Sequence, residues 1–204
     1  MNKLTTDLLN LISGLPSLDF KGAFSIRENG SCAARRSSEN ILIEDKKDAP
    51  GLVIHVKPRT RGETVYIPAC VTKSGLDDLV YNDFYIGEGA DIIIEAGCGV
   101  HSDGEEEARH NGIHRFFLAK NAHVLYREKH IANGNGTGAK RIDPVTDIEL
   151  EEGACLEMDS VQLGGVNRAV RKTRGVLQKD ARLVVRERIM TEGDEFAAPT
   201  LPCA

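Results

Sequence analysis

The sequence has no tryptophan, and aromatic residues make up only 5% of its 204 residues. It also lacks any run that approaches the roughly 20 apolar residues of a membrane-spanning helix. Near the N-terminus, Asp7, Asn10 and Gly14 interrupt any apolar segment of signal-peptide length. We therefore expect a cytoplasmic protein that contacts no membrane. The scarcity of aromatics and the 20 glycines favour short strands with many turns over a helical bundle.

An excess of positive charge is missing as well, because the formal net charge is -5 and the pI is about 5.7. A general nucleic-acid binder needs basic surface to neutralise phosphates, so we expect no nucleic-acid partner. The basic clusters at residues 168–174 and 182–188 alternate with apolar or acidic residues, which is typical of a solvated strand face. The five cysteines are odd in number, and we expect them to be reduced thiols.

One short pattern occurs four times. It consists of a turn residue, an alanine, any residue, an apolar residue, any residue and a second apolar residue, and it begins at Gly89, Asn121, Gly153 and Asp180. The four alanines are 32, 32 and 27 residues apart. A repeated spacing of this size predicts structural units that stack on one another.

The expected domain organisation has three parts. Residues 4–15 place five leucine and isoleucine side chains on one stripe, which predicts a short N-terminal helix within a cap of residues 1–19. We expect this helix to pack on the end of the main body, where it would protect open strand edges. Residues 20–193 would form the body, and residues 194–204 have no periodicity and are expected to be irregular.

The body is expected to be all β. Two strands for each repeat of 27 to 32 residues predict a flattened parallel β-helix, in which every repeat completes one circuit and like strands stack in register. The expected strands lie at residues 41–43, 52–56, 64–67, 80–86, 114–118, 123–131, 146–150, 155–163, 172–177 and 182–190.

The repeat also predicts which side chains share the interior. Counting in twos from each repeat alanine places Cys98 opposite His130 and Ala96 opposite Glu128, and Ser160, Gln162 and Glu187 continue the same polar rows. A thiol beside an imidazole can be ionised by it, and the thiolate is the form that accepts sulfur or binds metal. Alternatively, the strands bend after their first half and these residues reach the wet surface.

Several other groups of residues are candidate sites. Cys98, His101, His110 and His114 form a Cys-x2-His segment followed by two histidines four residues apart, which could be metal ligands, although His114 begins an apolar strand. The glycine-rich residues 134–140 lack the lysine and hydroxyl residue of a phosphate loop, so they predict a long turn and no nucleotide site.

Acidic residues at 103–107 and 151–152 are more typical of exposed loops and turns than of a glycosidase pair. No segment has the order of a serine nucleophile elbow.

The motifs resemble one family when their order and spacing are taken together. They are AGCGVH at 96–101, HNGIHRFF at 110–117, KNAHVLYREKH at 120–130, GTG at 136–138, SVQ at 160–162 and ERIMTEG at 187–193. Over residues 80–193 the sequence is similar to the core of the SufB/SufD scaffold proteins of iron-sulfur cluster assembly.

This resemblance implies a right-handed parallel β-helix that works with SufC, an ABC-type ATPase, and with a SufB/SufD-like partner. It further implies that Cys98 is the sulfur-accepting or cluster-building thiol and that His130 lines an internal polar channel. The repeat register adds Glu128 as an interior neighbour of these two residues. The scaffold itself would be no enzyme and bind no nucleotide, and an iron-sulfur cluster would be held only transiently.

The sequence also departs from the family pattern. Family members continue with more β-helix, a second cysteine and a C-terminal helical domain that binds SufC, whereas this sequence ends soon after residue 193 and resembles a shortened member. Two other functions stay open at this point. One is a β-helix enzyme acting on polysaccharide, and the other is a non-catalytic structural module that forms a homodimer through an uncapped stack end.

Overall fold

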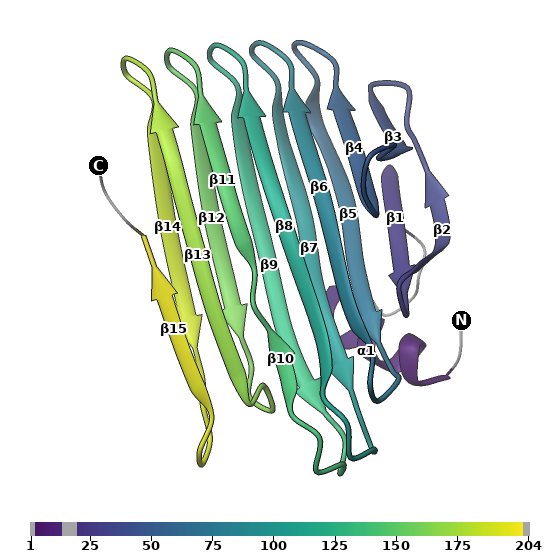
Figure 1. Ribbon diagram of the computed structural model, residues 1–204. Coiled ribbons are helices and arrows are strands. Elements are labelled where there is room, and N and C mark those ends of the chain that lie inside the picture. Colours follow the sequence, from purple (N-terminus) through teal and green to yellow (C-terminus); the bar gives the residue numbers. More distant parts are fainter. Residues whose placement is uncertain (1–2, 14–19, 202–204) are drawn as a thin grey trace.

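The chain folds into a β-solenoid of about 5 turns with parallel strands, as seen in a computed structural model that describes residues 3–13 and 20–201. Figure 1 shows the strands of successive circuits side by side, from the N-terminal circuits to the C-terminal circuits. The parallel β-helix predicted from the repeats is therefore confirmed. Within the described residues, no helix has the length and apolar character needed to cross a lipid bilayer.

Two sheets form the walls of the solenoid, and from β5 onward the chain alternates between them, except that β10 and β11 both lie in the second sheet. The first sheet has the order β14-β12-β9-β7-β5-β1-β2 and contains β1 (Ala23–Glu28), β2 (Ser31–Arg36), β5 (Arg61–Val71), β7 (Asp91–His101), β9 (His123–Asn133), β12 (Cys155–Gln162) and β14 (Arg182–Ile189). The second sheet has the order β10-β13-β11-β8-β6-β4-β3 and contains β3 (Ile41–Asp45), β4 (Gly51–Val56), β6 (Asp77–Ile86), β8 (Ala108–Leu118), β10 (Lys140–Ile142), β11 (Val145–Leu150) and β13 (Arg168–Leu177), with β15 (Phe196–Thr200) paired to β13.

The turn before each repeat alanine explains the residue that stands there. Gly89, Asn121, Gly153 and Asp180 all have left-handed backbone angles, with φ of 63°, 56°, 69° and 58°. Glycine adopts this conformation without strain, and asparagine and aspartate tolerate it better than other residues. The turns also stack, because the amide of Asn121 donates to the carbonyl of Glu152 on the next circuit. Turn chemistry therefore sets the register of the strands that follow.

Apolar side chains fill the part of the interior next to these turns, where the strands after the repeat alanines begin. Ile92, Val124 and Leu156 lie opposite one another on β7, β9 and β12, and each is at most 2% exposed. On the facing sheet, the rings of Phe84 and Phe116 stack with their centroids 4.5 Å apart. Full burial of each such side chain stabilises the fold by roughly 1.5–3 kcal/mol, so this row holds the two walls together.

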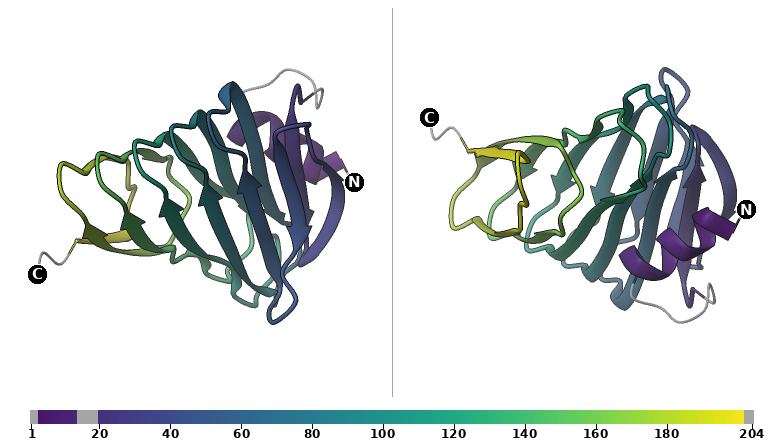
Figure 2. Two further views of the ribbon diagram at one scale, coloured as in Figure 1. Left: turned by 90° about the horizontal axis from the view of Figure 1, so that it is seen from above. Right: turned by 90° about the horizontal axis from the view of Figure 1, so that it is seen from below.

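Helix α1 (Lys3–Ser13) was expected on the end of the stack, and that prediction is wrong. The helix lies against the outer face of the first sheet, over β5, β7 and β9 (Figure 2). Its buried residues Leu8 and Ile12 pack over Gly99 and Gly97 of β7, where a Cβ atom would come within 3.0 Å of those side chains. The absence of outward side chains at these glycines creates the surface that the helix covers.

The N-terminal end of the solenoid instead carries two antiparallel strand pairs, β1 with β2 and β3 with β4. These pairs leave β2 and β3 as the edge strands of the two sheets. The expected helix stop at residues 14–16 lies outside the described residues.

At the other end, the expectation of an irregular tail at residues 194–204 is wrong for residues 196–200. They form β15, which pairs in parallel with the open edge of β13. Periodicity failed to reveal this strand because only five residues are involved and one of them is Pro199, which an edge strand tolerates. The remaining residues of the tail beyond 201 lie outside the described part.

The loops after β7 and β9 stack like the strands. The expected long turn at residues 134–140 is confirmed, and the amides of Gly136 and Gly138 donate to the carbonyls of Ser102 and Gly104 on the preceding circuit at 3.1 and 3.0 Å. A Cβ atom at Gly136 would lie 2.2 Å from the backbone oxygen of Gly104, so only glycine allows this approach. The acidic residues at 103–107, expected in an exposed loop, lie in the loop of residues 102–107 between β7 and β8.

The packing of α1 leads to a first prediction. Gly99→Val should lower the free energy of unfolding by about 1–3 kcal/mol, because the new side chain overpacks the contact with Leu8. Urea denaturation of the purified chain measures this change. Gly164→Ala is the matched control, since a Cβ atom there meets nothing closer than 3.7 Å. Equal stability of the two variants would contradict the close packing of α1 on β7.

Candidate functional site

Along each strand, counted from its repeat alanine, the first three inward side chains are apolar, and the interior becomes polar beyond them. Cys98 lies opposite His130 and Ala96 lies opposite Glu128, as the repeat register predicts. Cys98, Glu128 and His130 are 3%, 6% and 3% exposed, so they face the interior and the alternative of a wet surface is wrong for them. Ser160 and Gln162 of β12 continue the two rows opposite Glu128 and His130.

Ala96, Cys98, Glu128 and His130 line a cavity of about 290 Å³ between the two sheets. The second sheet contributes His110 and His114 from β8 to the same cavity. At its other end the lining includes Cys32 and Asp45, which are exposed residues of the N-terminal hairpins. The cavity therefore leads from Cys98 toward the surface at the N-terminal end of the solenoid.

Glu128 is the centre of a buried charge network. Its Oε1 accepts a hydrogen bond from Tyr126 Oη at 2.8 Å and lies 3.2 Å from His130 Nε2, while its Oε2 lies 2.6 Å from Arg171 Nη2. Burial opposes ionisation of this carboxyl, but the charge of Arg171 and the contact with His130 outweigh it and hold the pKa of Glu128 well below its usual value. Arg171 also contacts Glu187 at 2.6 Å, so its one positive charge faces two carboxylates.

A second buried ion pair lies on the other side of the cavity. Asp78 Oδ1 is 2.7 Å from Arg27 Nη2, and Asp78 Oδ2 is 3.1 Å from His110 Nδ1. Burial works against ionisation of Asp78, yet the hydrogen bonds from His110 and Arg27 hold its pKa below the usual value. His110 is thus oriented by a carboxylate, and its imidazole lines the cavity wall.

His114 is the one cavity imidazole that pairs with no carboxylate among the described residues. Its ring nitrogen Nδ1 is buried and has no hydrogen-bond partner there. Its ring stacks on Phe84 with a centroid distance of 5.8 Å. Burial lowers the pKa of His114 to about 4, and the Glu128 carboxylate offsets this only in part. At neutral pH the ring is therefore uncharged, which is the form that can donate a lone pair to a metal.

The expectation that His130 ionises the Cys98 thiol is wrong for this state of the protein. Burial is the main cause that raises the pKa of Cys98 well above its usual value, and the neighbouring Cys70, Asp78 and Glu128 raise it further. A thiolate would be an additional negative charge in a dry interior that already holds two carboxylates. Cys98 is therefore a neutral thiol at physiological pH.

The proposed metal group of Cys98, His101, His110 and His114 does not form. Among the described residues, these four do not come close enough to share one ion. His101 lies apart from the cavity, with its two ring nitrogens 2.7 Å from Asn133 Oδ1 and 3.0 Å from Asp103 Oδ2. The Cys-x2-His spacing failed because β7 is extended, so residues three apart point to opposite faces.

Sequence reasoning missed the charged partners Arg171, Arg27 and Asp78. Arg171 was grouped with residues 168–174 as a solvated face, but its side chain is 11% exposed and points inward. Ala169 and Thr173, two residues to either side of Arg171, are both buried, which only the structure shows. Alternation along β13 places Arg171 on their face of the strand.

Comparisons with known proteins add no assignment. No family model matches the chain, and no curated protein matches it. The function must therefore be argued from the chemistry of the cavity and from the motifs.

The Glu128 network gives a second prediction. Glu128→Gln should destabilise the fold by about 3–5 kcal/mol, because it leaves the buried Arg171 with less compensating charge. Thermal and urea unfolding measure the change. The control is Asp147→Asn, which removes the exposed pair with Arg174 at 2.7 Å and should change stability by less than about 1 kcal/mol. If both variants lose the same stability, Glu128 does not compensate a buried charge.

His114 gives a third prediction, concerning acid. Folding lowers the pKa of His114 from 6.5 to about 4. Between these pH values His114 is protonated in the unfolded chain and neutral in the folded chain, so the free energy of unfolding falls as the pH drops. His114→Phe keeps the stack on Phe84 and should remove a loss on the order of 3 kcal/mol over this range.

The measurement is urea unfolding at several pH values between neutral pH and pH 4. His55→Phe is the control, since His55 is an exposed histidine that also stacks on an aromatic ring, Tyr85, at 5.0 Å. An unchanged pH profile for His114→Phe would show that His114 is not held neutral by the fold.

Proposed function

We propose that this chain is a scaffold for iron-sulfur cluster assembly of the SufB/SufD type, in which Cys98 accepts sulfur or binds iron inside the solenoid. The observation that carries the proposal is the pair of neighbouring interior rows that places Cys98, Glu128 and His130 along one cavity of about 290 Å³. The motif resemblance assigns the building thiol to the same cysteine. The two arguments use different properties of the sequence, namely repeat register and motif order.

The donor set of the cavity suits iron and sulfide as cargo. A thiol and three imidazoles provide the soft and borderline ligands that iron-sulfur chemistry uses. Glu128 is occupied by Arg171, Tyr126 and His130, so its role is to orient His130 and supply negative charge. Ligation requires the thiolate, so iron binding would release the proton that Cys98 otherwise keeps.

Sulfur delivery would take place at the same thiol. A persulfide donor would transfer its terminal sulfur to Cys98 Sγ, so that the donor's S–S bond breaks and a new S–S bond forms on Cys98. The donor would leave as a thiol, and the proton of Cys98 would balance the exchange. The opening of the cavity near Cys32 and Arg35 is the route by which small species would reach it.

The partners in this proposal follow from the family resemblance. A SufC-like ATPase would supply nucleotide hydrolysis, and a SufB/SufD-like chain or a second copy of this chain would complete the assembly, while the scaffold itself would catalyse no reaction. The proposal places the protein in the cytoplasm, where thiols stay reduced. The four described cysteines Cys32, Cys70, Cys98 and Cys155 are all free.

Anaerobic reconstitution tests the proposal and is the fourth prediction. The purified chain, incubated with ferrous iron and sulfide, should develop cluster absorbance, and Cys98→Ser should lose most of it. Exposure to a small-molecule persulfide should add one sulfur atom in mass to Cys98, located by peptide mass spectrometry.

Cys155→Ser is the matched control, because Cys155 points away from the cavity on the outer face of the first sheet and the variant should keep the absorbance. Absorbance that survives in Cys98→Ser would overturn the cluster role. In that case a structural module that uses none of its interior thiols becomes the better assignment.

The polysaccharide hypothesis has one supporting feature, on the outer face of the second sheet. The rings of Tyr85 and Phe117 stack there with centroids 4.9 Å apart, and they line a hollow of about 330 Å³ together with Glu149 and Glu151. Exposed aromatic faces can contact sugar rings, and two carboxylates are the minimum for glycoside cleavage. This enzyme function stays an alternative to the scaffold.

A further inference from the structure

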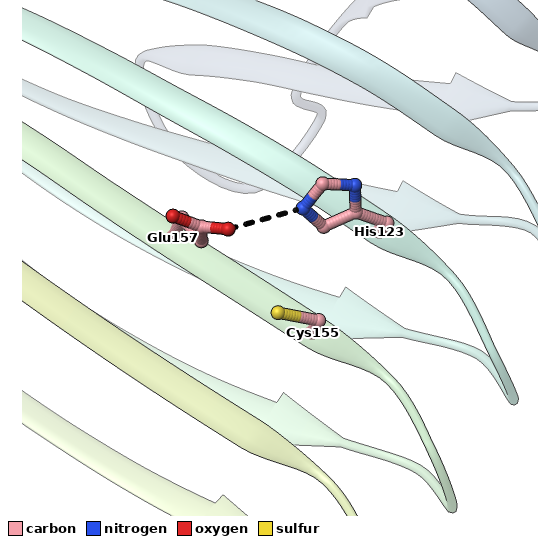
Figure 3. A group of neighbouring side chains, drawn as sticks. All are labelled: His123, Cys155 and Glu157. Atoms are coloured by element: carbon pink, nitrogen blue, oxygen red, sulfur yellow. Dashed lines mark ion pairs between the residues drawn. The ribbon is translucent and has the colours of Figure 1, made fainter.

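A second cluster of ligating side chains lies on the outer face of the first sheet, on the opposite side of the strands from the cavity. His123 of β9 lies directly opposite Cys155 of β12, and Glu157 follows two residues later on the same face. Figure 3 shows the three side chains gathered on these neighbouring strands. Their ligating atoms all lie within 4.8 Å of one another, and this is the one such group found among the described residues.

The imidazole of His123 is oriented for a ligand by a carboxylate. Its Nδ1 lies 3.1 Å from Asp91 Oδ1 on the neighbouring strand β7, so its Nε2 is directed toward Glu157 Oε1 at 3.6 Å. Metal-binding histidines usually donate their other ring N–H to a carboxylate in this way, because it fixes the tautomer and raises the basicity of the ligating nitrogen. Asp91 thus has the role of a positioning residue.

The two carboxylate oxygens of Glu157 have different partners. Its Oε2 lies 2.9 Å from Arg186 Nη1, while its Oε1 faces His123. Arg186 therefore holds the side chain in place and leaves one oxygen toward the group. The side chains of His123 and Glu157 are 41% and 30% exposed, so an ion could enter from solvent and water could complete its coordination.

We propose that His123, Cys155 and Glu157 form a zinc site with an open fourth position. Nitrogen, thiolate and carboxylate oxygen are the three ligand types of Zn²⁺, and three protein ligands plus water are typical of its open tetrahedral sites. Ligand atoms around a tetrahedral zinc are about 3.5 Å apart, so rotations of the cysteine and glutamate side chains would close the group. Binding would release the thiol proton of Cys155 to solvent.

This site is independent of the proposed scaffold function. Cys155 and Cys98 lie on different strands and opposite faces of the first sheet, one partly exposed and one buried. A zinc ion here would bridge β9 and β12 and stabilise two adjacent circuits of the solenoid.

Titration of the full, reduced chain with Co²⁺ alone tests the site and is the fifth prediction. Cobalt replaces zinc in such sites and reports a thiolate ligand by a charge-transfer band. The band should appear at about one equivalent, disappear in Cys155→Ser and weaken in His123→Gln. Competition with Zn²⁺ should give an affinity about 10–100-fold lower for Asp91→Asn, with the band itself retained.

Cys98→Ser and Cys32→Ser are the matched controls, and both should keep the band. Thermal unfolding without metal should be the same for the wild type and Cys155→Ser, which excludes misfolding as the cause of the loss. A band that persists in Cys155→Ser, or no band in the wild type, would overturn the zinc site and leave the three residues as an ordinary surface ion pair beside a thiol. Both outcomes are read in the Cys98→Ser background, which removes any band from the cavity thiol, so neither result depends on whether Cys98 builds clusters.

Discussion

In-register parallel pairing is the constraint on which the whole molecule depends. Parallel strands about 4.8 Å apart place each side chain directly over its counterpart on the next circuit. The pairing of β7, β9, β12 and β14 runs without a shift from the repeat alanines to the strand ends. Residues at one position of the repeat therefore share one environment on every circuit. The interior row that begins at Ile92 is apolar, and the rows that begin at Ala96 and Cys98 become polar on the following circuits.

The polar rows create an electrostatic problem that the second sheet solves. Glu128 and Glu187 lie in one interior row, with Ser160 between them, and two carboxylates this close would repel in a dry interior. Arg171 comes from the opposite wall and lies 2.6 Å from both. Because a buried charge without a partner is strongly destabilising, this contact couples the two sheets at the cavity. Glu128, the neighbour of His130 in this cavity, is thereby paired with a charge from the facing wall.

The sequence was sufficient for the features that repeat. Left-handed turn residues followed by alanines recur 32, 32 and 27 residues apart, so the solenoid and the pairing of Cys98 with His130 could both be predicted. Features that occur only once in the structure could not be predicted in this way. Arg171 lies on β13, whose strand carries no repeat alanine from which to count. The position of α1 depends on the outer face of β7, and the interior count ignored that face.

The same strand register also aligns the side chains on the outer face of the first sheet. In β7, inward Cys98 alternates with outward Gly97 and Gly99, so the residues that set the thiol in the cavity also make the flat surface on which α1 packs. In β9 and β12 the outward positions instead carry His123 and Cys155, opposite one another for the same reason that Cys98 meets His130. Stacking thus brings ligating residues together on both faces of one sheet. Burial then separates their chemistry, because the inner thiol is shielded from water and the outer one is not.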